Sequence, residues 1–566
     1  MRNWRRYILT GLCAAALAVF LIVPIVLAIG RGFADDGRFS LYWLKYFFRD
    51  FAARAELINS VKVAVLTTLL VTAISLPLAV LGRQYEFRGK NLVTALLMVP
   101  MILPPFVGAL AIKKLLAAEG GAVNLALAGM GLGKVDWLGG GLWGVVILET
   151  LHLYPIMYLN ASAALANVDP TMLEASRNLG ASPWRTFWKI TFPLIRPGLF
   201  AGGTIVFVWS FTELGTPQML EYATLPVAIL DGFQGPSPGA STYMKVFVML
   251  SASVGLYAVG RALFGSAAAR ATAGRGVAST TRRAGGLATA LIWAAFAGVT
   301  LLAVVPHLGV VLLAFSERWS TTILPQSWTL KHFREVFATE STWRSVLNSL
   351  RYASAATAVD IVLGLVIAFL VVRLRVRGAG ALDSLSMLPL AVPGLVIAGG
   401  YVALTAPGLL PGPVGEVLTS LGPMKDPTLI LIIAYSVRRL PYMVRSISAG
   451  LQQTSETLEE AARNLGAGPV RAALKVTVPL ISANVVAGAI LTFSFSMLEV
   501  SDSLVLAQTP PYYPITKEIF ILGGGTLGSN YNLAAAMGTL AMGLLTAALI
   551  AANLLLGKRL GAMFRV

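Results

Sequence analysis

The chain has 566 residues, of which 56% are hydrophobic and 12% charged, and its formal net charge is +18. A soluble globular protein has about 25% charged residues and could not bury so much apolar surface, so we expect a protein surrounded by lipid. The positive charge fits Lys and Arg in cytoplasmic loops, and no basic stretch interleaved with aromatic residues suggests nucleic-acid binding. The only cysteine, Cys13, excludes an intrachain disulfide and a cysteine-based metal cluster.

The chain begins with a basic segment that contains Arg2, Arg5 and Arg6, followed by the apolar run 8–29. This run is longer than the apolar part of a signal peptide, and no small-residue cleavage site closes it. The sequence therefore predicts an uncleaved first membrane helix whose start lies in the cytoplasm.

Twelve apolar runs are long enough to span a bilayer, and they fall into two sets of six. They lie at 8–29, 60–81, 92–112, 141–165, 198–220, 245–264, 287–315, 350–372, 384–405, 428–451, 484–506 and 532–556. Between the sets, the small and basic stretch 265–286 is typical of a flexible cytoplasmic linker. The predicted fold is an all-α membrane protein with two tandem six-helix domains, 1–264 and 287–566.

The distribution of Lys and Arg predicts the orientation of these helices. The loops on the same side as the N-terminus include Arg83, Arg88, Lys90, Arg270, Arg275, Arg282, Arg283, Arg373, Arg375, Arg377, Lys558, Arg559 and Arg565. The opposite loops also contain some basic residues, but fewer. By the positive-inside rule, we expect both termini in the cytoplasm and a multi-pass protein of a bacterial or archaeal plasma (inner) membrane.

One polar segment occurs twice in the chain. Residues 171–202 and 457–488 align without a gap, and 17 of the 32 positions are identical. Such a repeat indicates a tandem duplication. The agreement continues at the proline pairs Pro100/Pro389 and Pro104/Pro393, which interrupt the third and ninth runs. Both halves therefore run in the same direction, and we expect a pseudo-twofold axis along the membrane normal.

Each copy of the repeat has the signals of a helix–turn–helix knuckle on the cytoplasmic side, within 166–197 and 452–483. Asp169 and Ser455 are suited to cap the first helix of each copy, and Gly180 and Gly466 to end it. A pair of ordinary amphipathic interfacial loops would explain the mixed charge. It would not explain why the two halves agree best here, so we predict that the knuckles dock on a soluble partner.

The residues in the knuckles resemble the E-A-x-x-x-x-G motif of the inner-membrane permeases of binding-protein-dependent ABC importers. The motif consists of Glu174, Ala175, Gly180, Glu460, Ala461 and Gly466, with Pro-Leu pairs downstream at 193–194 and 479–480. Ser176 is a mild departure, since the second copy has Ala462. The resemblance covers nearly the whole chain, and the fused form is most similar to the ferric-iron branch, with thiamine, polyamine and phosphonate permeases as relatives.

This resemblance implies a type I importer. Two ATP-binding cassette subunits would each receive one knuckle as a coupling helix, and a periplasmic or extracellular solute-binding protein would deliver the substrate. Glu174 and Glu460 would contact the ATPase, and the two glycines would set the turn. The chain itself would be no enzyme and would need no cofactor. Its nearest approach to a P-loop, Gly133-Lys134, has Val135 where Ser or Thr must bind Mg²⁺.

A twelve-helix secondary transporter also has parallel halves and remains an alternative from another class. The knuckles distinguish the two, because a secondary transporter has no ATPase for them to bind. A membrane enzyme is a third class, but the sequence offers no nucleophile–base pair and no metal constellation.

Charged residues inside the predicted spans are candidates for the translocation path. Glu213 and Glu499 lie at equivalent positions, with Asp502 nearby, and would favour a cationic substrate. They could equally be hydrated or structurally paired carboxylates at helix ends. Arg438 and Arg439 could instead attract an anion.

Other polar residues in the spans have structural interpretations. An Arg438–Glu149 pair between the halves would be a plausible structural lock. The three histidines, His152, His307 and His332, lack ligand spacing, so we expect ordinary polar contacts and no bound metal.

Overall fold

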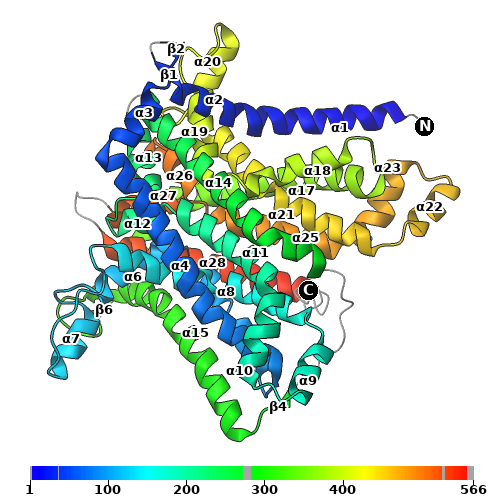
Figure 1. Cartoon of the computed structure of the whole chain (residues 1–566). Coiled ribbons are helices and arrows are strands. Elements are labelled where there is room, and N and C mark those ends of the chain that lie inside the picture. Colours follow the sequence, from blue (N-terminus) through cyan, green and yellow to red (C-terminus); the bar gives the residue numbers. More distant parts are fainter. Residues whose placement is uncertain are drawn as a thin grey trace.

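The chain folds into a bundle of helices with three small strand pairs in its described part (Figure 1). The structure is a computed structural model that describes residues 3–35, 37–102, 104–235, 238–271, 282–524 and 530–556. The centre of the expected linker and the basic residues expected at the C-terminus (Lys558, Arg559 and Arg565) lie outside these ranges. We call the described residues up to 271 the first half and those from 282 onward the second half.

The helical elements of the first half include two π-helical turns (η1, η3) and a 3₁₀ turn (η2). They are α1 (Asn3–Leu17), η1 (Ala18–Ile22), α2 (Val23–Gly32), α3 (Tyr42–Arg49), α4 (Phe51–Gln84), α5 (Lys90–Leu96), η2 (Val99–Ile102), α6 (Pro105–Leu115), α7 (Ala122–Gly129), α8 (Leu142–Ala166), α9 (Pro170–Asn178), α10 (Pro183–Thr186), η3 (Phe187–Thr191), α11 (Phe192–Thr212), α12 (Gly215–Met219), α13 (Leu225–Phe233) and α14 (Ala240–Ala271).

The second half has π-helical turns at η4 and η6 and 3₁₀ turns at η5 and η7. Its elements are α15 (Gly286–Phe315), α16 (Lys331–Ala338), α17 (Glu340–Ala368), η4 (Phe369–Arg373), α18 (Ala379–Met387), η5 (Leu388–Leu390), α19 (Gly394–Leu404), α20 (Pro413–Ser420), α21 (Thr428–Gln453), α22 (Thr457–Asn464), α23 (Pro469–Ala472), η6 (Ala473–Thr477), α24 (Val478–Leu480), α25 (Ser482–Met497), α26 (Ser501–Leu506), η7 (Pro510–Tyr512), α27 (Ile515–Gly524) and α28 (Tyr531–Leu556).

Two of the strand pairs are antiparallel and one is parallel. The antiparallel pairs are β1 (Ala34–Asp35) with β2 (Arg38–Phe39) and β5 (Ser316–Arg318) with β6 (Ser327–Trp328), and the parallel pair is β3 (Tyr85–Glu86) with β4 (Arg282–Arg283). The antiparallel pairs follow the first long helix of each half. The parallel pair joins the end of α4 to the chain that enters the second half.

Most of the expected membrane spans are present as apolar helices. Eight helices of the described chain are long and apolar enough to cross a membrane, or eleven if each of three bent helix pairs is one span. The remaining expected span, 428–451, is α21, a helix of 26 residues, or about 39 Å. It carries Arg438, Arg439 and Arg445, so its composition does not meet the same test. The expectation of twelve apolar spans is therefore not confirmed on composition.

Prolines break the third expected span of each half, as the sequence predicts. Pro104 and Pro393 each have an extended backbone, with ψ of 137° and 140°, directly before α6 and α19. Proline has no N–H to donate to the preceding turn, so the helix stops and restarts in a new direction. In the second half, the two pieces on either side of this break meet at 100°.

A three-helix cluster forms the centre of each half. Helices α4, α8 and α11 pack on one another, and α17, α21 and α25 do the same. These are the helices that directly precede and follow the knuckles, together with the long helix that starts each cluster. A movement of a knuckle would therefore act on the most closely packed helices of its half.

The first helix of each half packs on both halves. Helix α2 contacts α14 of its own half and α19 of the other, while α15 contacts α28 and α6. A glycine allows the close approach in each case. A Cβ atom on Gly400 would lie 2.6 Å from the backbone of Pro24, and one on Gly309 would lie 2.6 Å from the Cβ atom of Ala111. The Tyr401 hydroxyl also donates to the carbonyl oxygen of Phe20 at 2.6 Å. The two halves are therefore interlocked.

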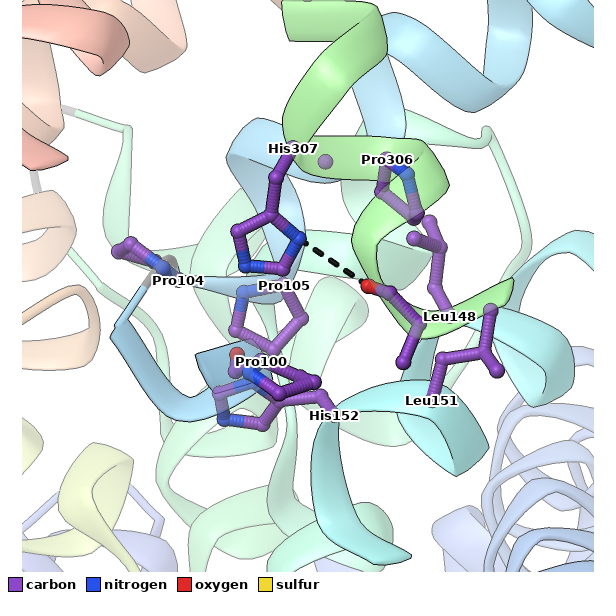
Figure 2. Close-up of a pocket in the computed structure, with 10 residues that line it drawn as sticks. Pro100, Pro104, Pro105, Leu148, Leu151, His152, Pro306 and His307 are labelled. Atoms are coloured by element: carbon purple, nitrogen blue, oxygen red, sulfur yellow. Dashed lines mark hydrogen bonds between the residues drawn. The ribbon is translucent and has the colours of Figure 1, made fainter. Parts of the chain in front are cut away.

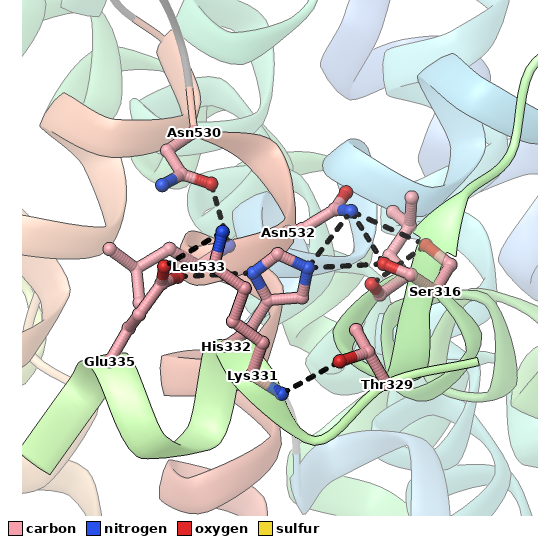
Figure 3. Close-up of polar contacts among 9 residues, drawn as sticks. Ser316, Thr329, Lys331, His332, Glu335, Asn530, Asn532 and Leu533 are labelled. Carbon is pink, nitrogen blue, oxygen red and sulfur yellow. Dashed lines mark hydrogen bonds and ion pairs between the residues drawn. The ribbon is translucent and has the colours of Figure 1, made fainter. Parts of the chain in front are cut away.

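A polar network ties the start of α28 to α16 and β5 (Figure 3). The Asn532 amide donates to the carbonyl oxygen of Ser316 at 2.7 Å, and His332 Nε2 lies 3.1 Å from the same oxygen. His332 Nδ1 lies 3.3 Å from Glu335 Oε2. His332 thus makes the ordinary polar contacts that the sequence analysis expected.

The close contact between the halves at Gly400 leads to a stability prediction. Gly400→Ala should lower the thermal midpoint of the purified protein by several degrees, because the new methyl group would meet the Pro24 backbone. Overpacking of this kind costs about 1–3 kcal/mol. Gly298→Ala is the matched control, since a Cβ atom there meets nothing within 4 Å. Equal midpoints for the two variants would contradict the close contact.

Candidate functional site

The first knuckle consists of α9, α10 and η3, and side chains cap both of its helices. The Asp169 carboxylate accepts hydrogen bonds from the N–H and the hydroxyl of Thr171, at 2.9 and 2.8 Å, which lower the pKa of this carboxyl. Ser182 Oγ accepts from the Arg185 N–H at 3.3 Å. Between the helices, Gly180 has a φ of +76°. The predicted cap and turn of the first copy are confirmed.

The second knuckle consists of α22, α23 and η6 and has the same path. Ser455 Oγ accepts from the Thr457 N–H at 3.3 Å, the first N–H of the helix. The residue directly before α22 is Glu456, whose side chain makes no capping bond, so Ser455 lies one residue before the N-cap position. Gly466 has a φ of +90°, and a Cβ atom on either Gly180 or Gly466 would meet nothing within 4 Å. The requirement for glycine at these positions is therefore the left-handed backbone and not a lack of space.

The two knuckles are held closed by different polar contacts. In the first, Ser176 Oγ and Thr186 Oγ1 are 2.9 Å apart and join α9 to α10. The second has Ala462 and Ala472 at these positions, so it lacks both hydroxyls.

A buried glutamate replaces this contact in the second knuckle. Glu459 is 7% exposed, forms an ion pair with Arg463 and accepts a hydrogen bond from Thr477 Oγ1 at 3.3 Å. The first knuckle has the apolar Leu173 in its place. The two knuckles therefore have the same backbone path but a different polar contact that holds each one closed. The alignment shows the residues that differ, and only the structure shows that one contact takes the place of the other.

The residues of the predicted coupling motif face outward. Glu174, Ala175, Gly180, Glu460, Ala461 and Gly466 are all exposed. Next to each glycine lies a leucine that is almost entirely exposed, Leu179 at 87% and Leu465 at 90%. Other large apolar side chains of the knuckles are exposed as well, Trp184 at 72% and Val470 at 69%, and several exposed apolar side chains on one protrusion are typical of a protein–protein contact.

A buried ion-pair cluster lies at the end of α25. Glu499 Oε1 is 2.5 Å from Arg438 Nη1, and its other carboxylate oxygen pairs with Arg439. Arg438 Nη1 is also 3.5 Å from Asp502 Oδ2. The hydroxyl groups of Ser503 and Thr516 donate to the Glu499 carbonyl oxygen. The structure thus brings together four of the five residues that the sequence suggested for the translocation path.

The fifth residue, Glu213, lies at the equivalent place in the first half, at the end of α11. Its carboxylate accepts from the Thr216 N–H at 3.3 Å, and it is within electrostatic reach of Glu499 and Arg438. Glu149 instead accepts a hydrogen bond from Ser210. The expected Arg438–Glu149 lock is therefore wrong, because Arg438 is held by the carboxylates of its own half.

A small pocket lies between the third-span break of the first half and α15 of the second half (Figure 2). It contains His152, the residue equivalent to Arg438. It is lined by the prolines of the third-span break together with His152 and His307. His152 Nδ1 lies 3.0 Å from the Pro100 carbonyl oxygen, and His307 Nδ1 lies 3.1 Å from that of Ala303. Among the described residues, no group of three or more His, Cys, Asp or Glu residues is arranged to hold a metal ion.

Gly394 and Asp360 are two contributors that the sequence analysis did not identify. A Cβ atom on Gly394 would lie 2.1 Å from Arg438 Nη1, so glycine at this position makes room for the guanidinium. The first half has Pro105 there, opposite His152, and comparison of the aligned halves could have revealed this paired difference. Asp360 accepts a hydrogen bond from Ser436 at 2.5 Å.

Comparison with known proteins gives one family that matches both halves. The sequence pattern of the family described as "Binding-protein-dependent transport system inner membrane component" matches residues 73–269 and 360–562.

Two relatives are named as ferric transport permeases. The putative ferric transport system permease protein FbpB 1 of Haemophilus influenzae is 27% identical over 520 residues, which cover 88% of this chain and 78% of the relative. The ferric transport system permease protein FbpB of Actinobacillus pleuropneumoniae is 26% identical, over 78% of this chain and 63% of the relative. A shorter relative, the molybdenum transport system permease protein ModB of Escherichia coli, is 33% identical over 31% of this chain and 75% of its own.

Two adjacent glutamates of the second knuckle, one buried and one exposed, allow a test of the buried contact. Glu459→Ala should lower the thermal midpoint by several degrees, because it leaves the Thr477 hydroxyl and Arg463 without their partner, a loss of about 1–3 kcal/mol. Glu460→Ala, one residue along and exposed, should change it by less than about one degree. Thermal unfolding of the detergent-solubilised protein measures both. A larger loss from Glu460→Ala would contradict the assignment.

Proposed function

Because the chain belongs to the family of binding-protein-dependent transport system inner membrane components, we propose that it forms the transmembrane path of an ATP-driven importer for ferric iron. The observation that carries this proposal is the match to a ferric transport permease over 88% of the chain. The chain is a membrane component and not an enzyme, so a separate ATP-binding subunit supplies the energy.

The proposal includes the arrangement expected from the sequence. Domains 1–264 and 287–566, joined by 265–286, have six spans each around a pseudo-twofold axis, with both termini in the cytoplasm. The repeated order of elements and the length of α21 support twelve spans. Basic residues on the side of the knuckles support the orientation.

Each knuckle binds one ATP-binding cassette subunit in this proposal. The exposed motif residues and the exposed Leu179 and Leu465 support a docking role. Since α8 and α21 directly precede the knuckles and pack in the three-helix clusters, force on a knuckle would reach the buried charges. A secondary transporter would have no use for two such outward-facing surfaces.

A solute-binding protein docks on the opposite side of the membrane. Helices α7 and α20 precede α8 and α21, and the knuckles follow them, so these short helices lie at the far end from the ATPase. Delivery of the substrate at that face would place it above the ends of the long helices.

Ferric iron fits the buried charges better than an oxyanion does. Both Arg438 and Arg439 already pair with Glu499, so neither guanidinium is free for molybdate or a phosphonate. The carboxylates of Glu213 and Asp502 are oxygen ligands of the kind that hard metal cations prefer. Thiamine and polyamines are also cationic and are the further substrates to test.

If the knuckles couple the protein to the ATP-binding subunits, substitutions at their tips should impair transport without unfolding the protein. Leu179→Ser together with Leu465→Ser should abolish co-purification of the ATP-binding subunit and substrate uptake, because docking loses its apolar anchors. Both side chains are about 90% exposed, so the variant should insert and melt like the wild type. Met424→Ser is the control and should retain the subunit, because Met424 is exposed in the segment before α21, at the end of that helix away from the knuckle. Full ATPase binding by the double variant would refute this docking site.

The substrate is tested with the reconstituted complex of permease, ATP-binding subunits and binding protein in liposomes. We expect ATP-dependent uptake of radiolabelled ferric iron, presented on the binding protein, and no uptake of radiolabelled molybdate. Thiamine and a polyamine are measured in the same way. Uptake of one of these with none of iron would replace ferric iron as the substrate. Uptake driven by an ion gradient without ATP would identify a secondary transporter.

A further inference from the structure

The buried cluster has more acidic than basic groups. The carboxyl groups of Glu499 and Asp502 pair with the guanidinium groups of Arg438 and Arg439. Two further carboxyl groups, those of Glu213 and Asp360, are within electrostatic reach of these arginines. Glu499 is 2% exposed and Asp502 and Asp360 are fully buried. Burying an uncompensated charge is costly, so positive charge from protons or from a cation has to balance the excess.

Asp502 is the least satisfied member of the cluster. Neither of its carboxylate oxygens has a hydrogen-bond partner among the described residues, and the side chain is fully buried. Its nearest cationic atom, Arg438 Nη1, is 3.5 Å away and is closer to Glu499. A buried carboxylate without hydrogen bonds, beside a guanidinium that is shared with another carboxylate, is a ready ligand for a cation.

Two other basic groups of the interior are engaged elsewhere. Lys517 donates to the Leu504 carbonyl oxygen at 3.0 Å and lies over the ring of Tyr513. His152, at the position equivalent to Arg438, is hydrogen-bonded at Pro100 in the pocket of Figure 2. Neither compensates the charge of Asp502 in this arrangement.

Arg438 reaches the carboxylates through space that only glycine leaves open. Gly394 lies against its guanidinium, and the first half has a proline and a histidine at the two equivalent positions. The side chain of Arg438 is 21% exposed, whereas its two carboxylate partners are buried. Arg438 is thus the member of the cluster with access to a less enclosed region. If the Arg438 side chain moved away, Arg439 would remain paired with Glu499.

We propose that Asp502 and Glu499, joined by Glu213, form a transit site for a multivalent, oxygen-liganded cation, and that the Arg438 guanidinium occupies this site when no cargo is present. In the described arrangement the three carboxyl groups are not grouped to hold a metal ion, and Arg438 is the partner of Glu499 and Asp502, so the site forms only when the guanidinium leaves. The proposal rests on the proposed function as a cation importer and gives it a location. The cation replaces the guanidinium as the positive partner of Asp502 and Glu499, with Glu213 contributed by the other half. The guanidinium returns when the cation leaves, so the carboxylates are never left without a positive charge.

The test uses Tb³⁺, a hard trivalent ion whose luminescence reports binding, with the full chain in nanodiscs and no ATP-binding subunit. Arg438→Gln should bind Tb³⁺ at least about tenfold more tightly than the wild type, because the competing cation is gone. Adding Asp502→Asn to this variant should remove the gain. Arg445→Gln is the matched control on the same helix, since Arg445 is exposed and pairs with Asp383 outside the cluster.

The outcomes separate this site from the importer function. Unchanged Tb³⁺ affinity in Arg438→Gln, or a gain that persists with Asp502→Asn, would show that protons alone balance the cluster and would overturn the site. If Arg438→Gln does not insert, Asp502→Asn alone decides the matter, since it should weaken Tb³⁺ binding about tenfold relative to the wild type, and an unchanged affinity would overturn the proposal. Failure of ferric uptake in liposomes with Tb³⁺ binding intact would instead reject the ferric substrate and leave the site standing.

Discussion

The hydrocarbon core of a bilayer neither donates nor accepts hydrogen bonds and screens charge poorly. This constraint decides where the backbone polar groups and the charged side chains of the protein can lie. Backbone groups are satisfied within helices, and where prolines break the third span a carbonyl group finds another partner, since that of Pro100 lies 3.0 Å from His152 Nδ1. Charged side chains are left with two kinds of place. Some project from the membrane, as in the knuckles, and others lie inside it with a polar partner, as Arg438 and Arg439 do with Glu499 and as Asp360 does with Ser436.

The duplicated halves have kept their backbone plan and changed their polar contacts in coordinated sets. The first knuckle is closed by two hydroxyls, Ser176 and Thr186, and the second by Glu459 with Thr477. Each set is complete in itself, because a single exchange would leave a polar group without its partner. Paired replacement preserved the shape of the docking surface while its internal support changed.

Inside the membrane, paired replacements between the two halves have made their charged residues different. His152 with Pro105 in the first half corresponds to Arg438 with Gly394 in the second, so only one half places a guanidinium among the carboxylates. Glu213 and Glu499 are equivalent in sequence, and each accepts the equivalent backbone hydrogen bond, from Thr216 and from Asp502. Their environments still differ, because only Glu499 also holds two arginines. A path between the halves would therefore be lined by two different surfaces, driven by two similar knuckles.

The sequence alone determined the all-helical membrane class, the duplication, the proline breaks, and the caps and glycine turns of the knuckles. These depend on local rules, such as the missing N–H of proline and the left-handed backbone of Gly180 and Gly466, that need no knowledge of distant neighbours. The tertiary structure decided which charges meet. Arg438 pairs with Glu499 and Asp502 and not with Glu149, and Gly394 leaves the room that its guanidinium needs there. Helical spacing places a residue on a face, but only the packing of several helices fixes what that face meets.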